Sequence, residues 1–172
     1  SSPMDRRPKF HLYQPNIALI SGIAWDHINV FPTYENYVEQ FEIFIKLITN
    51  GGILVYNEDD AEVKRIAEAA TNPIRKLAYT TPKYKVENGI TLLETPEGNM
   101  PIEVFGAHNL NNLAGAKWIC QNMGVDEADF YEAIASFKGA SKRLEKIAES
   151  KTKVAYKDFA HSPSKVSATT KA

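Results

Sequence analysis

The sequence lacks several features that would each point to a particular class of protein. Its 172 residues include a single cysteine, Cys120, which excludes a disulfide framework and fits a reducing compartment such as the cytoplasm. Its longest apolar runs, such as Ile17 to Ile20, are far too short to cross a bilayer. The formal net charge is −1, so no field of one sign favours nucleic acid or a membrane surface as a partner.

Two further absences concern catalysis and the ends of the chain. The sequence contains no phosphate-binding loop of the type Gly-x-x-x-x-Gly-Lys-Ser/Thr, no zinc-ligand spacing and no convincing serine or cysteine triad. The chain does not begin with methionine, and its last expected helix continues to the final residue. We therefore expect a piece of a longer protein. Nothing in the sequence indicates an oligomeric state.

The first third of the chain has the pattern of a parallel α/β sheet. An unbroken apolar run within residues 16–23 is typical of a strand buried on both faces. Thr33 can cap a helix that has one apolar face, and Asn50-Gly51-Gly52 would end this helix. A second strand over 53–56 and a helix over 61–70, preceded by Asp59 and Asp60, follow. This alternation predicts parallel strands flanked by helices.

The middle of the chain predicts a small antiparallel meander. Asn88-Gly89 between two apolar runs is typical of a type I′ hairpin. A turn over 97–99 then leads to a third strand over 102–105. The later elements that we expect are helices over about 109–123 and 126–137, a strand over 154–159 and a helix opened by Pro163. The polar stretch 147–153 is the expected domain boundary.

Polar residues follow the expected strands, at the edge where parallel sheets bind ligands. His27 follows the first strand and could ligate a metal or touch phosphate; the alternative is a loop histidine bonded to backbone. Asn109 and Asn112 are three residues apart, so both amides can share one helix face and match the edge of an adenine ring. The alternative is that Asn109 is only an N-cap.

Two later motifs join strands to helices. Lys142 and Arg143 stand beside Gly139, where a basic pair could reach phosphate oxygens; the alternative is a solvated basic turn. Asp158 and His161 lie between the expected last strand and the helix at Pro163. They could meet a ligand there, or Asp158 and Ser162 could simply cap the helix.

Each of these signals is weak alone, but their order along the chain is specific. Asp-His at 26–27, Asn-x-Asp-Asp at 57–60, Gly-x-His-Asn-x-x-Asn at 106–112, Phe-x-Gly-x-x-x-Arg at 137–143 and Asp-Phe-Ala-His-x-Pro at 158–163 together resemble the Mur ligase family. The resemblance implies an α/β fold. Residues 1–149 would form the later part of the central ATPase domain, with a mostly parallel sheet and a meander. Residues 150–172 would form the first strand and helix of a Rossmann-like C-terminal domain.

The resemblance also implies roles, with ATP and Mg²⁺ as cofactors in a cytoplasmic enzyme. His27 matches a histidine that helps to hold magnesium. Asn109 and Asn112 match adenine-binding residues, with His108 beside them. Arg143 matches a catalytic arginine that contacts nucleotide phosphate. Asp158 matches an aspartate near the ribose, and His161 belongs to the same motif as a second catalytic candidate.

Within the family, Asp5-Arg6-Arg7-Pro8-Lys9-Phe10 resembles one branch. That branch joins UDP-N-acetylmuramate to the tripeptide L-alanyl-γ-D-glutamyl-meso-diaminopimelate through an acyl phosphate. Two alternatives stay open: the branch that adds L-alanine to the same nucleotide sugar, and a noncatalytic nucleotide-binding or interaction domain. The chain departs from the family pattern at Gly22, Lys157 and Ser162. Since the phosphate loop is missing, we expect no ligation from these 172 residues alone.

Overall fold

A computed structural model describes residues 4, 5 and 7–172. Arg6, part of the motif at residues 5–10, lies outside the described residues. The chain divides into two compact units. Unit 1 takes the chain up to Thr80 together with Ala114–Gly124, and unit 2 takes Thr81–Leu113 together with Val125–Ala172.

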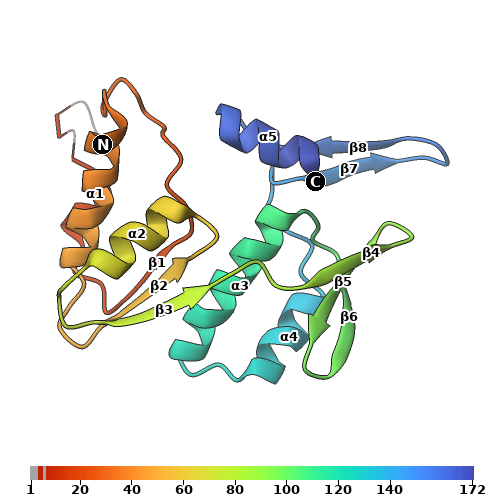
Figure 1. Cartoon of the computed structure of the whole chain (residues 1–172). Coiled ribbons are helices and arrows are strands. Elements are labelled where there is room, and N and C mark those ends of the chain that lie inside the picture. The colour runs from red at the N-terminus through yellow and green to blue at the C-terminus, as the bar shows by residue number, and fades with distance from the viewer. Residues whose placement is uncertain (1–3, 6) are drawn as a thin grey trace. The chain divides into compact units, whose positions relative to one another are not determined.

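Unit 1 contains a parallel sheet, which confirms the expected fold class. Its strands are β1 (Ile17–Ile20), β2 (Ile53–Asn57) and β3 (Arg75–Tyr79), in that order (Figure 1). All five residues of β2 are buried, as expected for a central strand with both faces covered. The sequence did not predict β3, because its charged first half has no strand-like apolar run.

Both predicted helices of unit 1 begin at the expected positions. Helix α1 (Tyr34–Lys46) starts after Thr33, whose hydroxyl accepts the Asn36 amide at 3.1 Å. Helix α2 (Ala61–Ala69) starts after Asp60, whose Oδ1 accepts the amides of Glu62 at 3.0 Å and Val63 at 3.1 Å. These bonds satisfy amides that have no partner within the helix.

Apolar side chains cover the two faces of this sheet separately. One cluster joins Ile20 and Leu54 to residues of α1 and α2. The other joins Val55 and Tyr79 to the part of helix α3 (Ala107–Asn122) that belongs to unit 1. Gly115 lies at this contact, and a Cβ there would stand 2.9 Å from the Tyr79 hydroxyl. A glycine is therefore what lets α3 pack this closely on the sheet.

Unit 2 contains the predicted antiparallel meander, formed by β4 (Tyr84–Glu87), β5 (Ile90–Thr95) and β6 (Gly98–Ile102). Asn88 and Gly89 both have positive φ, 51° and 77°, which confirms the type I′ turn. The third strand was predicted at 102–105 and instead spans β6. Thr95 pairs with Gly98 and its hydroxyl donates to the Gly98 carbonyl at 2.8 Å, so the reversal falls at residues 96–97.

The remaining elements of unit 2 differ from expectation mainly at their ends. Helix α3 begins two residues before the predicted start, and α4 (Glu127–Ala135) is shorter than predicted. Strand β8 (Val154–Lys157) pairs antiparallel with β7 (Glu145–Glu149), which was not predicted. The stretch expected as a polar boundary, 147–153, thus includes the end of β7. The division at residue 150 stays a prediction.

Helix α5 (Pro163–Lys171) begins at Pro163, as predicted. Proline suits this position because its missing N–H would have no partner in the first turn. Across residues 4, 5 and 7–172, no helix combines the length and apolar character needed to span a membrane.

Candidate functional site

A cleft of about 980 Å³ lies in unit 2. Its walls come from β5, β6 and the segment that follows, the first turn of α3, the segment from Lys138 to Lys146, and β8. The predicted site residues that line it are Asn109 and Arg143. Unit 2 thus brings a candidate adenine-binding amide and a candidate phosphate-binding cation to one cavity.

Asn109 lies inside the first turn of α3 and is not its N-cap. Its backbone amide donates to the Gly106 carbonyl at 3.0 Å, and its side-chain Nδ2 donates to the Phe105 carbonyl at 2.9 Å. The N-cap alternative for Asn109 is therefore wrong. Asn112 lies one turn further along α3 and is exposed. The spacing of three does place both residues along the same side of the helix.

Asn111, between the two predicted amides, has a structural role that the motif did not reveal. It is only 8% exposed, and its Nδ2 donates to the Thr81 hydroxyl at 3.1 Å. This bond ties α3 to the segment between β3 and β4, and so helps to fix the helix turn that carries Asn109. A buried amide needs such a partner, because an unpaired polar group in the interior is costly.

His108 is half-buried and shares its surroundings with two other predicted site residues. Burial lowers its pKa below the usual value; the Asp158 carboxylate opposes that shift, and the Arg143 charge adds to it. The imidazole is therefore neutral at pH 7, with one nitrogen donating and the other accepting. The three predicted cofactor residues His108, Arg143 and Asp158 thus interact electrostatically within unit 2.

Asp158 and His161 follow β8 but differ in what they contact. The Asp158 carboxylate accepts the amides of Leu144 at 2.8 Å and Ala160 at 2.6 Å. The exposed His161 ring shares a hydrogen bond of 2.8 Å with the Phe159 carbonyl and lies 5.0 Å from the Phe159 ring. Among the described residues that line the cleft, His161 does not appear.

The capping alternative for the Asp158–Pro163 loop holds only in part. Ser162 is the N-cap residue of α5, but within the described chain its side chain makes no capping bond. Asp158 instead accepts from the Thr169 hydroxyl of α5 at 3.3 Å. The carboxylate therefore contacts a side chain in the last turn of α5 and does not cap its first turn.

His27 belongs to unit 1, in the loop that follows β1. Its ring is exposed, and its carbonyl accepts the amides of Val30 at 2.8 Å and Phe31 at 3.0 Å. Within residues 4, 5 and 7–172, no group of three or more His, Cys, Asp or Glu side chains could hold a metal ion. These bonds belong to the main chain of His27 and not to its ring, so its magnesium role and the alternative of a ring bonded to backbone both stay predictions.

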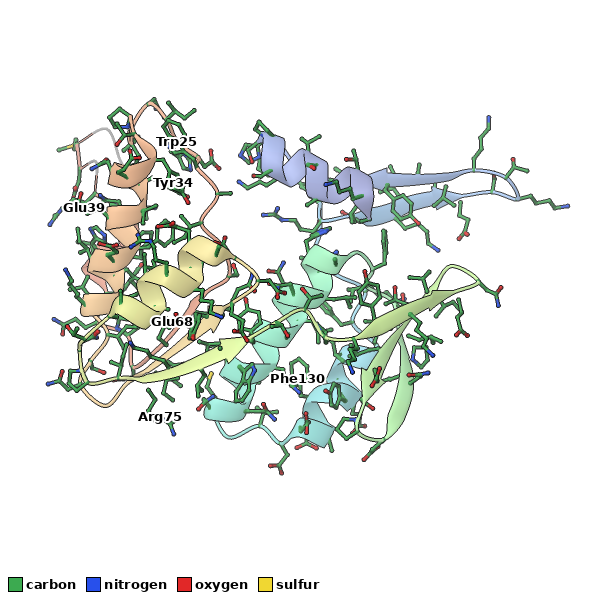
Figure 2. All side chains as sticks on the ribbon, viewed as in Figure 1. Trp25, Tyr34, Glu39, Glu68, Arg75 and Phe130 are labelled. Atoms are coloured by element: carbon green, nitrogen blue, oxygen red, sulfur yellow. The ribbon has the colours of Figure 1, made fainter. Side chains whose placement is uncertain are left out.

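The loop that carries His27 is held by the second predicted motif of unit 1. The Asn57 side chain donates to the Ser21 carbonyl at 3.0 Å, and Asp60 Oδ2 accepts the Ile23 amide at 2.9 Å. Trp25, labelled in Figure 2, donates from its indole to the Phe31 carbonyl at 3.0 Å. The Asn-x-Asp-Asp motif thus positions the segment after β1.

The aromatic and remaining basic residues of the cleft were not predicted from the sequence. The rings of Phe105 and Tyr156 lie 5.3 Å apart in an edge-to-face arrangement. Lys138 and Lys146 add positive charge to the wall, and Glu145 adds a carboxylate. Residues 154–157 read Val-Ala-Tyr-Lys and show no alternation of apolar and polar residues, so no pattern along β8 marked Tyr156 in advance.

Phe10, the last residue of the motif at residues 5–10, packs on α1. The ring of Phe10 lies 5.1 Å from that of Phe44 and 5.5 Å from that of Phe41. His11, in the same short 3-10 helix (Lys9–Leu12), shares a hydrogen bond of 2.9 Å between its Nε2 and the Gln40 carbonyl. The described part of this segment therefore anchors the start of unit 1 to its core.

Comparisons with known proteins agree on one family. The model of the Mur ligase middle domain matches residues 2–120. The UDP-N-acetylmuramate–L-alanine ligase of Caldicellulosiruptor bescii is 28% identical over 172 aligned positions, covering 93% of this chain and 38% of the relative. In Escherichia coli K12, the UDP-N-acetylmuramate–L-alanyl-gamma-D-glutamyl-meso-2,6-diaminoheptandioate ligase is 26% identical over 178 positions, covering 96% and 38%.

A solved structure supports the fold. MurF from Acinetobacter baumannii superposes with a TM-score of 0.78 at 19% identity, covering 94% of this chain and 38% of that protein. The chain thus spans about two fifths of the length of the relatives it matches.

Proposed function

The chain belongs to the Mur ligase family, and we propose that the protein carrying it forms an amide bond in a reaction driven by ATP. The observation that supports this most directly is the cleft of unit 2, which gathers Asn109 and Arg143 with His108 and Asp158 nearby. An amide, a neutral imidazole and a guanidinium can together recognise a purine edge and phosphate oxygens.

Different residues of the cleft would contact different parts of the nucleotide. Asn109 and Asn112 offer amides to the adenine edge, and the neutral imidazole of His108 adds a donor and an acceptor beside them. Phe105 and Tyr156 provide aromatic surface in the same cleft. Arg143 binds phosphate oxygens through its fork of N–H groups, which matches them in a bidentate way.

Arg143 would then act on the charge that develops during catalysis. A carboxylate of UDP-N-acetylmuramate attacks the γ-phosphorus of ATP, which forms an acyl phosphate and releases ADP. The incoming amine attacks the acyl carbon, and the tetrahedral intermediate expels inorganic phosphate to leave the amide. A fixed cation near the transferring group offsets negative charge in the transition state.

Magnesium fits this chain only in part. Mg²⁺ prefers near-octahedral oxygen ligands, supplied by carboxylates, water and substrate phosphates. His27 could add one nitrogen ligand, but among the described residues no group of three or more His, Cys, Asp or Glu side chains could hold the ion. We therefore assign His27 as a candidate contact and derive no catalytic step from the ion.

For the substrate we propose the tripeptide L-alanyl-γ-D-glutamyl-meso-diaminopimelate. The motif at residues 5–10 and the similarity to the Escherichia coli enzyme support it. The relative from Caldicellulosiruptor bescii instead supports L-alanine. Phe10 packs against α1, so this motif indicates the branch by its sequence and not by a substrate contact.

A ligation assay separates these alternatives. Both the 172-residue chain and the longest reading frame containing it would receive ATP, Mg²⁺, UDP-N-acetylmuramate and either tripeptide or L-alanine. Phosphate release and product mass would be measured. We expect product from the tripeptide with the longer protein, and none from the 172 residues, whose sequence has no phosphate loop. Product from L-alanine alone would establish the other branch, and nucleotide binding without any product would establish a noncatalytic domain.

Arg143 provides the residue-level test. Arg143→Ala should lower kcat of the longer protein by about 10²-fold or more, as for other single groups that stabilise transition-state charge. Arg75→Ala is the matched control, because Arg75 bonds to Asn122 Oδ1 at 3.1 Å within unit 1. If both variants keep full activity, the phosphate role of Arg143 is wrong.

A further inference from the structure

The carboxylate of Asp158 connects three separate segments of unit 2. Its Oδ2 accepts the amide of Leu144, which lies before β7, at 2.8 Å. Its Oδ1 accepts the amide of Ala160, after β8, at 2.6 Å and the hydroxyl of Thr169, on α5, at 3.3 Å. The resemblance implies that Asp158 lies near the ribose of the nucleotide. In the structure, both carboxylate oxygens already accept hydrogen bonds from the chain itself.

The loop that receives this bond is strained on both sides of Arg143. Lys142 and Leu144 have φ values of 58° and 50°, in the left-handed region that residues with a side chain rarely adopt. Such conformations cost free energy and persist only where the surroundings hold them in place. Arg143 therefore lies between two residues that need external support.

Hydrogen bonds supply that support from two directions. The Lys142 amide donates to Glu145 Oε2 at 2.8 Å, and the Lys142 carbonyl accepts the Phe159 amide at 2.9 Å. The Leu144 amide donates to Asp158. Residues 158 and 159, directly after β8, thus bind the backbone immediately before and immediately after Arg143.

Charge favours the same arrangement. Burial raises the pKa of Asp158, but the amides of Leu144 and Ala160, the Thr169 hydroxyl and the Arg143 charge outweigh it, so the net pKa lies below its usual value. Asp158 is therefore ionised at neutral pH. Hydrogen bonds to an ionised acceptor are shorter and stronger than those between neutral groups.

We propose that Asp158 is a positioning residue: it holds the strained loop at residues 142–144 so that Arg143 lines the nucleotide cleft. The part of this statement that concerns nucleotide rests on the proposed function, whereas the anchoring of the loop does not. Asp158 acts through Arg143, and it need not contact the ribose to affect nucleotide binding.

Amide exchange on the 172-residue chain tests the anchoring by itself. Asp158→Asn should accelerate exchange of the Leu144 amide by about tenfold or more, the loss expected for one hydrogen bond to a charged acceptor. Thr169→Val, which removes one donor to Asp158, should cause a smaller change in the same direction. Thr170→Val is its matched control, because the Thr170 hydroxyl donates to the Val166 and Ser167 carbonyls instead.

Unchanged Leu144 exchange in Asp158→Asn would overturn the proposal. Should Asp158→Asn fail to fold, the comparison of Thr169→Val with Thr170→Val still decides, since equal exchange in the two would also overturn it.

Nucleotide binding separates positioning from a ribose contact. In the protein used for ligation, Asp158→Asn should weaken ATP and 2′-deoxy-ATP equally, by about tenfold. Added to Arg143→Ala, it should have little further effect, because both changes remove the same phosphate contact. Weaker binding of ATP with unchanged binding of 2′-deoxy-ATP would instead show a ribose contact and overturn the positioning role. If Arg143→Ala changes neither binding nor ligation, the proposed function of Arg143 fails while the exchange result stands.

Discussion

In each unit an aspartate accepts a backbone amide of the loop that carries predicted site residues, but the elements beside the two aspartates differ in burial. In unit 1, Asp60 accepts the Ile23 amide from the loop after β1. In unit 2, Asp158 accepts the Leu144 amide from the loop that carries Arg143. Asp60 caps a helix whose inward residues are buried, beside a strand, β2, that is buried throughout. Asp158 follows β8, whose four residues are all exposed.

This difference shows where the stability of each loop comes from. Around Asp60, apolar residues of α1, α2 and the sheet form a continuous core that fixes the strand ends. In unit 2, β4 and β8 have no buried residue. The anchors of the Arg143 loop are therefore mainly hydrogen bonds. A loop held by polar bonds can be released by changing one acceptor, whereas a loop on a packed core requires loss of the core.

Removing part of the unit 1 core should give the largest effect. Leu54 is fully buried in β2, so Leu54→Ala should cost about 2–5 kcal/mol of unfolding free energy through lost burial and the cavity left behind. Ile147→Ala on β7, where Ile147 is 58% exposed, should cost less than about 0.5 kcal/mol. Urea denaturation followed by circular dichroism measures both. Similar losses in the two variants would remove the contrast between the units.

Removing the unit 1 carboxylate should have a smaller effect. Asp60→Ala loses the cap of α2 and the bond to Ile23, which together should cost about 1–3 kcal/mol. Asp126→Ala is the control, since Asp126 is also an N-cap residue but, in the described structure, makes no side-chain capping bond. Denaturation would compare the two variants, and amide exchange at Ile23 would report the loop. Equal costs would mean that the observed bonds of Asp60 add nothing.

Features set by local rules were predictable from the sequence. The cap at Thr33, the helix start after Asp59-Asp60 and the Asn88-Gly89 turn each depend on a few neighbouring residues, and each appears as expected. Strands β3 and β7 were missed because their sequences are mixed or polar. Pairing with a neighbouring strand, and not their own pattern, makes them strands.

The polar residues of the candidate site were predictable from the sequence, but the contacts that hold them in place were not. Resemblance identified Asn109, Arg143 and Asp158, and the structure places them together in unit 2. The bond between Asp158 and Leu144 joins residues 14 positions apart and depends on how β8 ends beside β7. No local motif encodes such a contact, and the same holds for the Phe105–Tyr156 pair.

The pH dependence of His108 should give the smallest effect and the most local information. Its folded pKa lies below the unfolded value of about 6.5. The stability that it contributes is therefore complete above that pH and is lost as the pH falls through the folded pKa. An NMR titration of the ring follows this protonation directly.

Arg143→Ala should raise the pKa of His108, because the neighbouring cation disfavours protonation. Asp158→Asn should lower it, because a neighbouring carboxylate favours protonation. Shifts of the same sign in both variants would mean that the Asp158 carboxylate affects His108 no more than the Arg143 charge that it positions.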